Sequence, residues 1–279
     1  MIIRFFILLF FALTAAAPAL GEIYKFTFTS AWDEDDVSSE FPADAHFTQL
    51  VGATHIPGAP LWTSGGIASL GIENVAELGN PTVLISEVDT AILAGTAGAY
   101  LKIRGLFNPS SSRTKLLEIL DDKPVVTLIS MVAPSPDWFV GVSDLSLRDE
   151  SGWIESLTID LMPWDAGTED GNTFTLSNPP TNPQSIIAIP PDSPFIGSPV
   201  IATLQIEHIA PTGDINENGF VDVGDVFLAT RFMQGLATPT LQQLTRADLM
   251  PIDSQGNPAP DGQVTLADVL RLQQLIMGL

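Results

Sequence analysis

Apolar and polar residues alternate with a period of two in several short stretches of this chain. The pattern is clearest at residues 23–29 and 200–209, as expected for strands that bury one face. Further strand-like runs, separated by turns rich in Gly, Pro and Ser, cover residues 46–51, 99–103, 125–132, 139–142, 154–161 and 173–176. Residues 72–78 and 114–120 favour short helices, and the Pro-rich residues 178–199 favour a long surface loop. Many short strands joined by such turns predict a mainly β protein, a β-sandwich.

Composition narrows the classes of partner and of site. The 279 residues allow two compact domains, and 45% hydrophobic residues support a sizeable core. Only 11 Lys and Arg oppose 33 Asp and Glu, which gives a net charge of -22. This balance argues against a nucleic-acid partner and against direct binding to anionic lipid, although calcium could bridge the protein to lipid. The absence of cysteine excludes disulfides, thiolate catalysis and Cys-based zinc sites. His46, His55 and His208 follow no metal-ligand spacing, so we expect structural roles for them.

The first 21 residues have the pattern of a secretory signal peptide. Arg4 supplies the positive region, residues 7–13 supply the apolar region, and small residues at 17–21 offer cleavage sites. The alternative is an uncleaved anchor, but the apolar run is short for a membrane span. We therefore expect a secreted, extracellular or periplasmic protein with no membrane insertion after cleavage. Every Asn-x-Ser/Thr triplet of the sequence has Pro in the middle, which blocks N-glycosylation. This favours a bacterial source.

Two turns each place a Trp beside an Asp, as Asp137-Trp138 and Trp164-Asp165. If the strands deliver both turns to one end of a sandwich, Asp137, Asp165 and Glu169 converge. Clustered like charges are unfavourable without a cation, and oxygen ligands suit a hard cation such as calcium. One alternative is that these acids only bond the backbone of their own turns. Another is glycoside hydrolysis by the pair Asp137 and Asp165.

Long motifs in the same region resemble the spondin domain, the amino-terminal type found in F-spondin and mindin. They are H-F-T-Q-L-V-G-A-T-H at 46–55, L-W-T-S-G-G-I-A-S-L-G-I at 61–72, P-S-P-D-W-F-V-G at 134–141 and D-L-M-P-W-D-A-G-T-E-D-G at 160–171. The resemblance covers residues 22–211 and implies a C2-like antiparallel β-sandwich that binds calcium. It places the calcium carboxylates on Asp137, Asp165 and Glu169. The third is an Asp in the family, so Glu169 is a departure, and Asp170 is a possible substitute. The lack of cysteine is a second departure from the animal spondin proteins.

A different pattern begins after Pro211. Gly219 holds the sixth place of a twelve-residue loop, where an EF-hand turns sharply, and the carbonyl of Phe220 holds the seventh. Oxygen-bearing side chains occupy the first, third, fifth, ninth and twelfth places: Asp214, Asn216, Asn218, Asp222 and Asp225. A helix is expected directly after this loop.

A second, interrupted copy of the loop follows. Asp248 opens it, and the later places fall on Asp261, Gln263 through its carbonyl, Thr265 and Asp268. An insertion over residues 250–260 separates the two parts, and its Asp253 is an optional ligand. The duplicated loop and helix resemble the type I dockerin repeat over residues 212–279, an EF-hand-like module. The alternative for either loop is an acidic turn.

Dockerins bind cohesin domains, and the tenth and eleventh loop places help to choose that partner. Here these places are Val223-Gly224 and Leu266-Ala267, which are largely apolar and put a cohesin partner in question. The repeat could instead dock on its own spondin domain. The sequence therefore predicts a secreted, calcium-binding, non-enzymatic adhesion protein whose partner is an extracellular protein or a matrix or glycan surface. The alternatives are a scaffold that calcium only stabilises and a secreted hydrolase acting on glycans.

Overall fold

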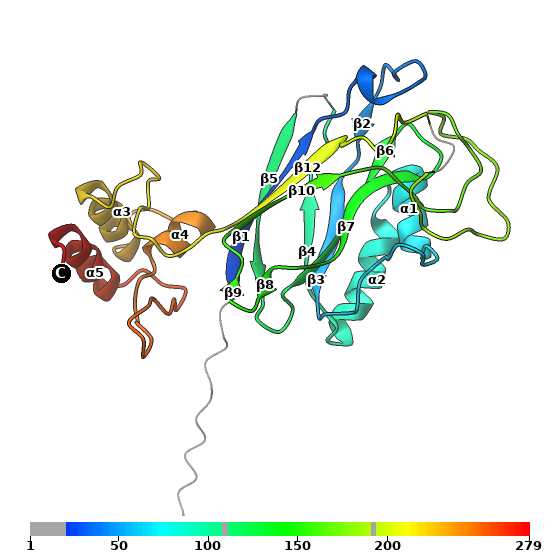
Figure 1. Cartoon of the computed structure of the whole chain (residues 1–279). Coiled ribbons are helices and arrows are strands. Elements are labelled where there is room, and N and C mark those ends of the chain that lie inside the picture. The colour runs from blue at the N-terminus through cyan, green and yellow to red at the C-terminus, as the bar shows by residue number, and fades with distance from the viewer. Residues whose placement is uncertain (1–20, 108–110, 191–193) are drawn as a thin grey trace, which may run out of the picture.

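Two antiparallel sheets form the body of the protein in the computed structural model, which describes residues 21–107, 111–190 and 194–279 (Figure 1). The first sheet has the order β10-β12-β1-β5. Its strands are β1 (Glu22–Ser30), β5 (Ser112–Ile119), β10 (Ser156–Leu161) and β12 (Ala202–His208). Every pairing in it is antiparallel. The predicted signal peptide lies outside the described residues, apart from Gly21.

The second sheet has the order β11-β7-β6-β3-β4, with β2 also paired to β6. Its strands are β2 (His46–Phe47), β3 (Leu50–His55), β4 (Ala97–Ile103), β6 (Val125–Ala133), β7 (Trp138–Ser146) and β11 (Trp164–Asp165). A separate ribbon joins β8 (Arg148–Asp149) to β9 (Gly152–Trp153). The mainly β, antiparallel, sandwich-like architecture predicted from the sequence is therefore confirmed.

The main core fills the space between the two sheets. Tyr24, Phe26 and Phe28 alternate along β1 and are fully buried there. Trp32 and Trp138 belong to the same core and pack near Phe174, with ring centroids 5.5 Å away in both cases. Edge-to-face and tilted aromatic contacts of this kind add stability beyond the area that they bury. These rings close the end of the sandwich at which β7 begins.

Two helices cover the outer face of the second sheet (Figure 1). They are α1 (Leu70–Leu78) and α2 (Thr82–Leu93), and a 3-10 turn, η1 (Glu34–Asp36), precedes them. Ser69 caps α1 by accepting the amide of Ile72, and Gly79 ends it in the left-handed region at φ 61°. Ile72 and Val75 then pack against the sheet beside Phe139.

A small helical tail follows the sandwich. It contains α3 (Val223–Met233), α4 (Leu241–Ala247) and α5 (Leu266–Met277), and α3 packs against α5. Its own core consists of Ile215, Ala229, Ala247, Leu249, Val269 and Leu272. β12 begins beside the end of β10, where Ala202 pairs with Leu161, and it runs from there to His208 at the other end of the sheet. The tail therefore leaves the sandwich at the end opposite the turn that follows Leu161 (Figure 1).

The structure corrects two predicted elements. Residues 114–120 are not a helix, because Thr114 pairs with Thr27 and Leu117 with Tyr24 in the ladder between β5 and β1. Residues 173–176 are not a strand, since Phe174 is held by packing on aromatic rings rather than by a ladder. No helix in the described ranges is both long and apolar enough to cross a membrane.

Candidate functional site

The two Trp-Asp turns meet at one end of the second sheet. Trp138 pairs with Asp165, and Phe139 pairs with Trp164, in the ladder between β7 and β11. Ser135 fixes the first turn, because its hydroxyl accepts the amide of Trp138 at 3.1 Å. The predicted meeting of the two turns is therefore present, and it places Asp137 beside the turn that carries Asp165.

Asp137 is the buried centre of this region. The residue is 0% exposed. Its Oδ2 accepts the amide of Thr168 at 2.6 Å, the hydroxyl of Thr168 at 3.2 Å and the amide of Glu169 at 3.2 Å. Its Oδ1 is also buried and has no hydrogen-bond partner. A buried carboxylate oxygen without a donor is costly, and a cation is one way to satisfy it.

Asp165 and Glu169 lie at the surface of the same region. Asp165 Oδ1 accepts the amide of Gly167 at 2.8 Å, and Glu169 Oε2 accepts from Asn178 Nδ2 at 3.3 Å. A hollow of about 330 Å³ lies there, lined by Trp138, Asp165, Gly167, Glu169, Asp170, Gly171, Thr181, Ser185, Ile186, Ala188 and Pro190. Asp170, the suggested substitute for Glu169, accepts the hydroxyl of Thr181 at 2.6 Å.

Burial and mutual repulsion act on the carboxyl groups of this region. Burial raises the pKa of Asp165 to about 6, and the negative charges of Asp137 and Asp170 add to the rise. Burial is also the largest cause of the raised pKa values of Asp137, Glu77 and Glu169. No Lys, Arg or His of the described ranges forms an ion pair with any of these groups. The region therefore holds negative charge that the protein itself does not neutralise.

Glu77 is a member of this region that the sequence reasoning missed. It projects from α1. Burial is the largest cause of its raised pKa, and the negative charges of Glu73 and then Asp137 add to the rise. The side chain of Thr168 also contacts it, so Thr168 lies between Glu77 and Asp137. Periodicity assigns residue 77 to the predicted helix but does not indicate that this helix lies over the Asp turns.

The oxygen atoms of this region are of the kind that bind calcium. Calcium takes six to eight oxygen ligands and accepts carboxylates together with backbone carbonyls. Asp137 offers a buried oxygen without a partner, and Asp165 and Glu169 offer carboxylates nearby. Yet no three Asp, Glu, His or Cys side chains in the described ranges stand together as a formed metal site. Binding would thus require Glu169 or Asp165 to turn inward, and the calcium site stays a prediction.

The raised pKa of Asp165 predicts how stability varies with pH in a chelator. Its pKa lies above the ordinary value of 3.8, so the folded state favours the protonated form. This contribution is present below about pH 4 and is lost as the pH rises through about 6. Asp165→Asn is therefore expected to raise the free energy of unfolding in chelator by about 1–3 kcal/mol at about pH 7.5, and to have little effect at about pH 4. The measurement is the melting temperature at the two pH values.

The matched control for this measurement is Asp160→Asn, which removes the same charge from an exposed position on β10. It should leave both melting temperatures within about a degree of the wild type. If Asp165→Asn lowered the melting temperature equally at both pH values, Asp165 would be a structural hydrogen-bond acceptor and not a strained charge.

The first loop of the tail is folded around its predicted ligands. Asp225 is fully buried, and its carboxylate accepts the amides of Ile215 at 2.8 Å, Asn216 at 3.1 Å and Asp222 at 2.9 Å. Asp214 accepts the amides of Asn218 at 3.2 Å and Gly219 at 3.0 Å. Asn218 Oδ1 accepts the amide of Phe220 at 2.9 Å. Gly219 has φ 89°, the conformation for which the sixth place needs glycine.

The second loop repeats these bonds. Asp268 is fully buried and accepts the amides of Leu249 and Met250 at 2.8 Å each, and that of Thr265 at 2.7 Å. Asp248 accepts the amides of Asp261 at 3.2 Å and Gly262 at 2.6 Å, and the Gln263 amide donates to Asp261 at 3.0 Å. Asp248 thus corresponds to Asp214 and Asp268 to Asp225. Burial raises the pKa of Asp248 to about 6, with the charges of Asp261 and Asp268 contributing.

This correspondence locates the insertion. Residues 251–260 of the second loop stand where the first loop has only Glu217, and Met250 stands where the first has Asn216. Asp253 accepts the amides of Gln255 at 2.9 Å and Asn257 at 2.8 Å within the insertion. The optional ligand Asp253 therefore belongs to a local turn, and the second loop has no oxygen-bearing side chain at its third place.

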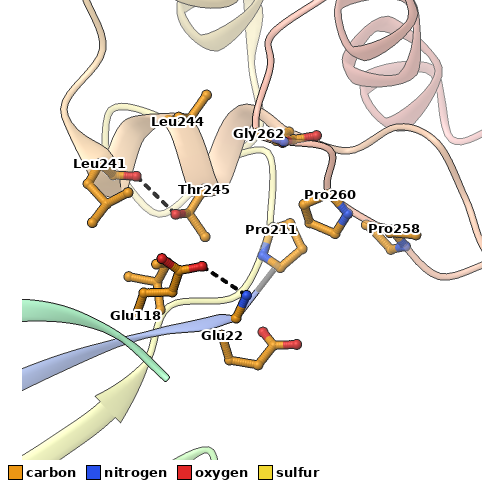
Figure 2. A pocket seen from close by; sticks show the side chains of 13 residues that line it. Glu22, Glu118, Pro211, Leu241, Leu244, Thr245, Pro258, Pro260 and Gly262 are labelled. Carbon is orange, nitrogen blue, oxygen red and sulfur yellow. Dashed lines mark hydrogen bonds between the residues drawn. The ribbon is translucent and has the colours of Figure 1, made fainter. Parts of the chain in front are cut away.

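A second hollow, of about 490 Å³, lies where the tail meets the sandwich (Figure 2). Glu22 and Glu118 line it from the sandwich, while Leu241 and Leu244 line it from α4. Pro258, Ala259 and Pro260 of the insertion and Asp248 and Gly262 of the second loop complete the wall. The second loop and its insertion thus face the sandwich directly.

The three histidines occupy structural positions. His55 is buried, with Nε2 2.8 Å from the Thr127 hydroxyl and Nδ1 2.8 Å from the Ile56 carbonyl. His208 pairs through Nε2 with Glu22 at 2.8 Å, and this hydrogen bond raises its pKa. His46 Nδ1 lies 2.7 Å from the carbonyl of Asp44.

Comparison with known proteins agrees with the geometry of the sandwich. A family model described as Spondin_N matches residues 22–194. Spondin-1 of Homo sapiens is 33% identical over 208 residues, which cover 68% of this chain and 26% of spondin-1. Spondin-2 of Homo sapiens is 32% identical over 176 residues, which cover 62% of this chain and 53% of spondin-2. The chain therefore spans about a quarter of spondin-1 and about half of spondin-2.

Proposed function

Because this chain belongs to the Spondin_N family, we propose that it is a secreted, calcium-binding, non-enzymatic protein of extracellular adhesion. Its sandwich domain, residues 22–211, would bind one calcium ion at the Trp-Asp turns. Its tail, residues 212–279, would bind calcium in two EF-hand-like loops of the dockerin type. An extracellular protein, or a matrix or glycan surface, would be its partner.

One observation carries the calcium proposal for the sandwich. Asp137 Oδ1 is buried without a donor, in a region where Asp165 and Glu169 also have raised pKa values. A bound cation would supply the missing partner and lower the repulsion among the three carboxylates. When bound, calcium would tie the turn before β7 to the turn after β11, which stiffens this end of the sandwich. The longer Glu169 could reach the ion while its amide remains on Asp137.

The proposal for the tail is supported by the repeated bonding of its loops. Asp225 and Asp268, at the twelfth places, hold the start of their loops and also cap the following helices. A ligand that reaches both ends of a loop in this way couples ion binding to folding of the loop. The first loop should bind more tightly, because Met250 contributes no side-chain oxygen to the second.

The hollow at the junction supports docking of the tail on its own sandwich. The insertion of the second loop and the end of β5 share that hollow, so occupation of the second loop would alter this junction (Figure 2). Docking within one chain does not need the polar contacts that a cohesin partner would require at Val223 and Leu266.

Binding of the full mature chain to immobilised extracellular matrix and to cell surfaces, with calcium and with chelator, tests the adhesion role. Calcium-dependent retention that Asp137→Asn removes would support it. Absence of retention under both conditions would leave calcium as a stabiliser of an exported scaffold, which is the main alternative. Unchanged binding by Asp137→Asn would separate adhesion from the sandwich site.

The hydrolase alternative receives no support from the site. General acid and base catalysis needs both carboxylates within reach of the substrate. Asp137 does not line the hollow beside Asp165, and its Oδ2 is occupied by three donors. The hollow beside Asp165 therefore does not offer Asp137 to a substrate, as glycoside hydrolysis by this pair would require.

A further inference from the structure

Basic residues are gathered in one part of this acidic chain. Between Asp89 and Glu118 the sequence contains no acid, and it carries Lys102, Arg104 and two further cations, Arg113 and Lys115. These four side chains account for a large share of the 11 Lys and Arg in a chain with 33 Asp and Glu. Such local concentration against the net charge calls for a physical reason.

The four cations lie along two neighbouring sheet edges. Lys102 lies on β4, the edge of the second sheet, and Arg104 directly follows that strand. Arg113 and Lys115 lie on β5, the edge of the first sheet. β4 and β5 lie side by side, so the two sheet edges meet on one side of the sandwich (Figure 1). We call these four residues the basic edge.

All four side chains of the basic edge are exposed and free of ion pairs. No carboxylate in the described ranges lies within 4.0 Å of their charged nitrogens. Other cations of the sandwich do pair, as in Lys25 with Glu207 at 2.7 Å and Lys123 with Asp122 at 2.6 Å. The basic edge therefore presents positive charge that the protein does not use internally.

Two exposed aromatic rings belong to the same stretch of chain as Lys102 and Arg104. Tyr100 is 44% exposed, and Lys102 Nζ lies 5.3 Å from the centre of its ring. Phe107 is 66% exposed and stacks on His46 with ring centroids 5.3 Å apart. Exposed rings beside cations offer flat apolar contacts together with charge, a combination suited to a polymer of sugar rings that carries anionic groups.

Protection of sheet edges is the structural alternative. Charged side chains, lysine above all, prevent edge strands from pairing with other chains. Protection requires only charge, however, and an acidic protein could supply it with Asp or Glu. Four cations, with Glu118 as the one acid on β4 or β5, are therefore not explained by protection alone.

We propose that the basic edge binds a linear anionic polysaccharide, either sulfated or rich in uronic acid. Along a strand, alternate side chains recur about every 6.7 Å, so each of the two edges offers an extended polymer a pair of charges at that spacing. A broad anionic surface, such as a membrane, would also meet the acids that give the remainder of the chain its negative charge. A narrow, flexible polymer can contact the basic edge alone.

This inference names one chemical class for the proposed extracellular partner, and it uses neither the Asp137 site nor the tail. Heparin is the probe, titrated into the full mature chain in chelator and low salt. Binding is expected without calcium, with an affinity that falls as salt rises because counterions are released. Failure of the calcium proposal would leave this binding unchanged, so the two proposals can fail separately.

Two double variants and one control locate the site. K102Q/R104Q and R113Q/K115Q should each weaken heparin binding by about tenfold and flatten its salt dependence. R231Q/R271Q removes the same charge from the tail and should change the affinity by less than about twofold. Circular dichroism and the melting temperature check that each variant is folded.

Four results would overturn the proposal. The first is absence of heparin binding at low salt, and the second is an equal loss of affinity in R231Q/R271Q. The third is binding of phosphatidylserine vesicles or of single-stranded oligonucleotides where heparin fails, which would assign the basic edge to another class of polyanion. Unchanged affinity in both double variants would leave edge protection as its role.

Discussion

Asp137→Asn is expected to abolish the rise in melting temperature that calcium gives the sandwich. An ion at one hundred times its Kd stabilises a protein by about 2.7 kcal/mol, which corresponds to roughly 5–10 °C for a domain of this size. The amide retains one oxygen to accept from Thr168 and Glu169, so the turn itself should persist. Differential scanning calorimetry of the full chain, with calcium and with chelator, measures the effect.

In chelator the same variant should melt at the wild-type temperature or slightly above it. The substitution removes a buried carboxylate whose pKa is raised by burial, so the charge is a cost when no cation is bound. Asp160→Asn serves as the matched control and should keep the full response to calcium. An Asp137→Asn protein that still gained the same stability from calcium in the sandwich transition would remove Asp137 from the site.

Asp268→Ala is expected to unfold the tail and leave the sandwich folded. The carboxylate of Asp268 is fully buried and accepts three amides and the Thr265 hydroxyl. Each buried donor left without a partner costs about 1–3 kcal/mol. The tail has only a small core of its own, so a loss of about 3–5 kcal/mol is expected to exceed its free energy of unfolding.

Hydrogen exchange followed by mass spectrometry distinguishes the two regions. In Asp268→Ala, amides of α3 and α5 should exchange at rates close to those of an unfolded chain, while amides of β1 and β6 remain protected. Asp253→Ala is the control, because Asp253 holds only an exposed turn of the insertion. Protection of α5 in Asp268→Ala would mean that the loop does not depend on its twelfth residue.

Much of the sandwich could be predicted because its strands alternate between apolar and polar residues. Residues 23–29 lie within β1 and residues 200–209 contain β12, and these two strands pair with each other. The assignment failed at residues 114–120, where exposed polar residues on an edge strand do not show which partner they pair with. Only the ladder with β1 identifies β5 as a strand. The helix α2 was missed because its buried stripe is narrow, with Leu84 and Val88 alone fully inside.

The candidate site, like the sandwich, could be predicted from the sequence only in part. The sequence predicted that Asp137 and Asp165 would become neighbours, since two matching Trp-Asp turns flank strands of one sheet. It could not show that Oδ2 of Asp137 would be occupied by Thr168 and Glu169, or that Glu77 would approach from α1. Those contacts depend on how a helix and a loop pack over the turns, which one sequence does not specify.

In the tail, spacing alone predicts the first calcium loop because every place is filled without interruption, and its calcium binding stays a prediction. The second loop is aligned with the first only through its hydrogen bonds. The amides of Leu249 and Met250 donate to Asp268, as the amides at the start of the first loop donate to its twelfth residue. An insertion hides such a correspondence from spacing rules but does not disturb it in space.

The most direct test of the account is a calorimetric titration of calcium into the full mature chain and into Asp137→Asn. We expect the wild type to bind in the sandwich and in the tail, and Asp137→Asn to lose one binding event while retaining those of the tail. Identical titrations for the two proteins would contradict the account. They would show that calcium does not bind at the Trp-Asp turns and that the buried carboxylate of Asp137 has another purpose.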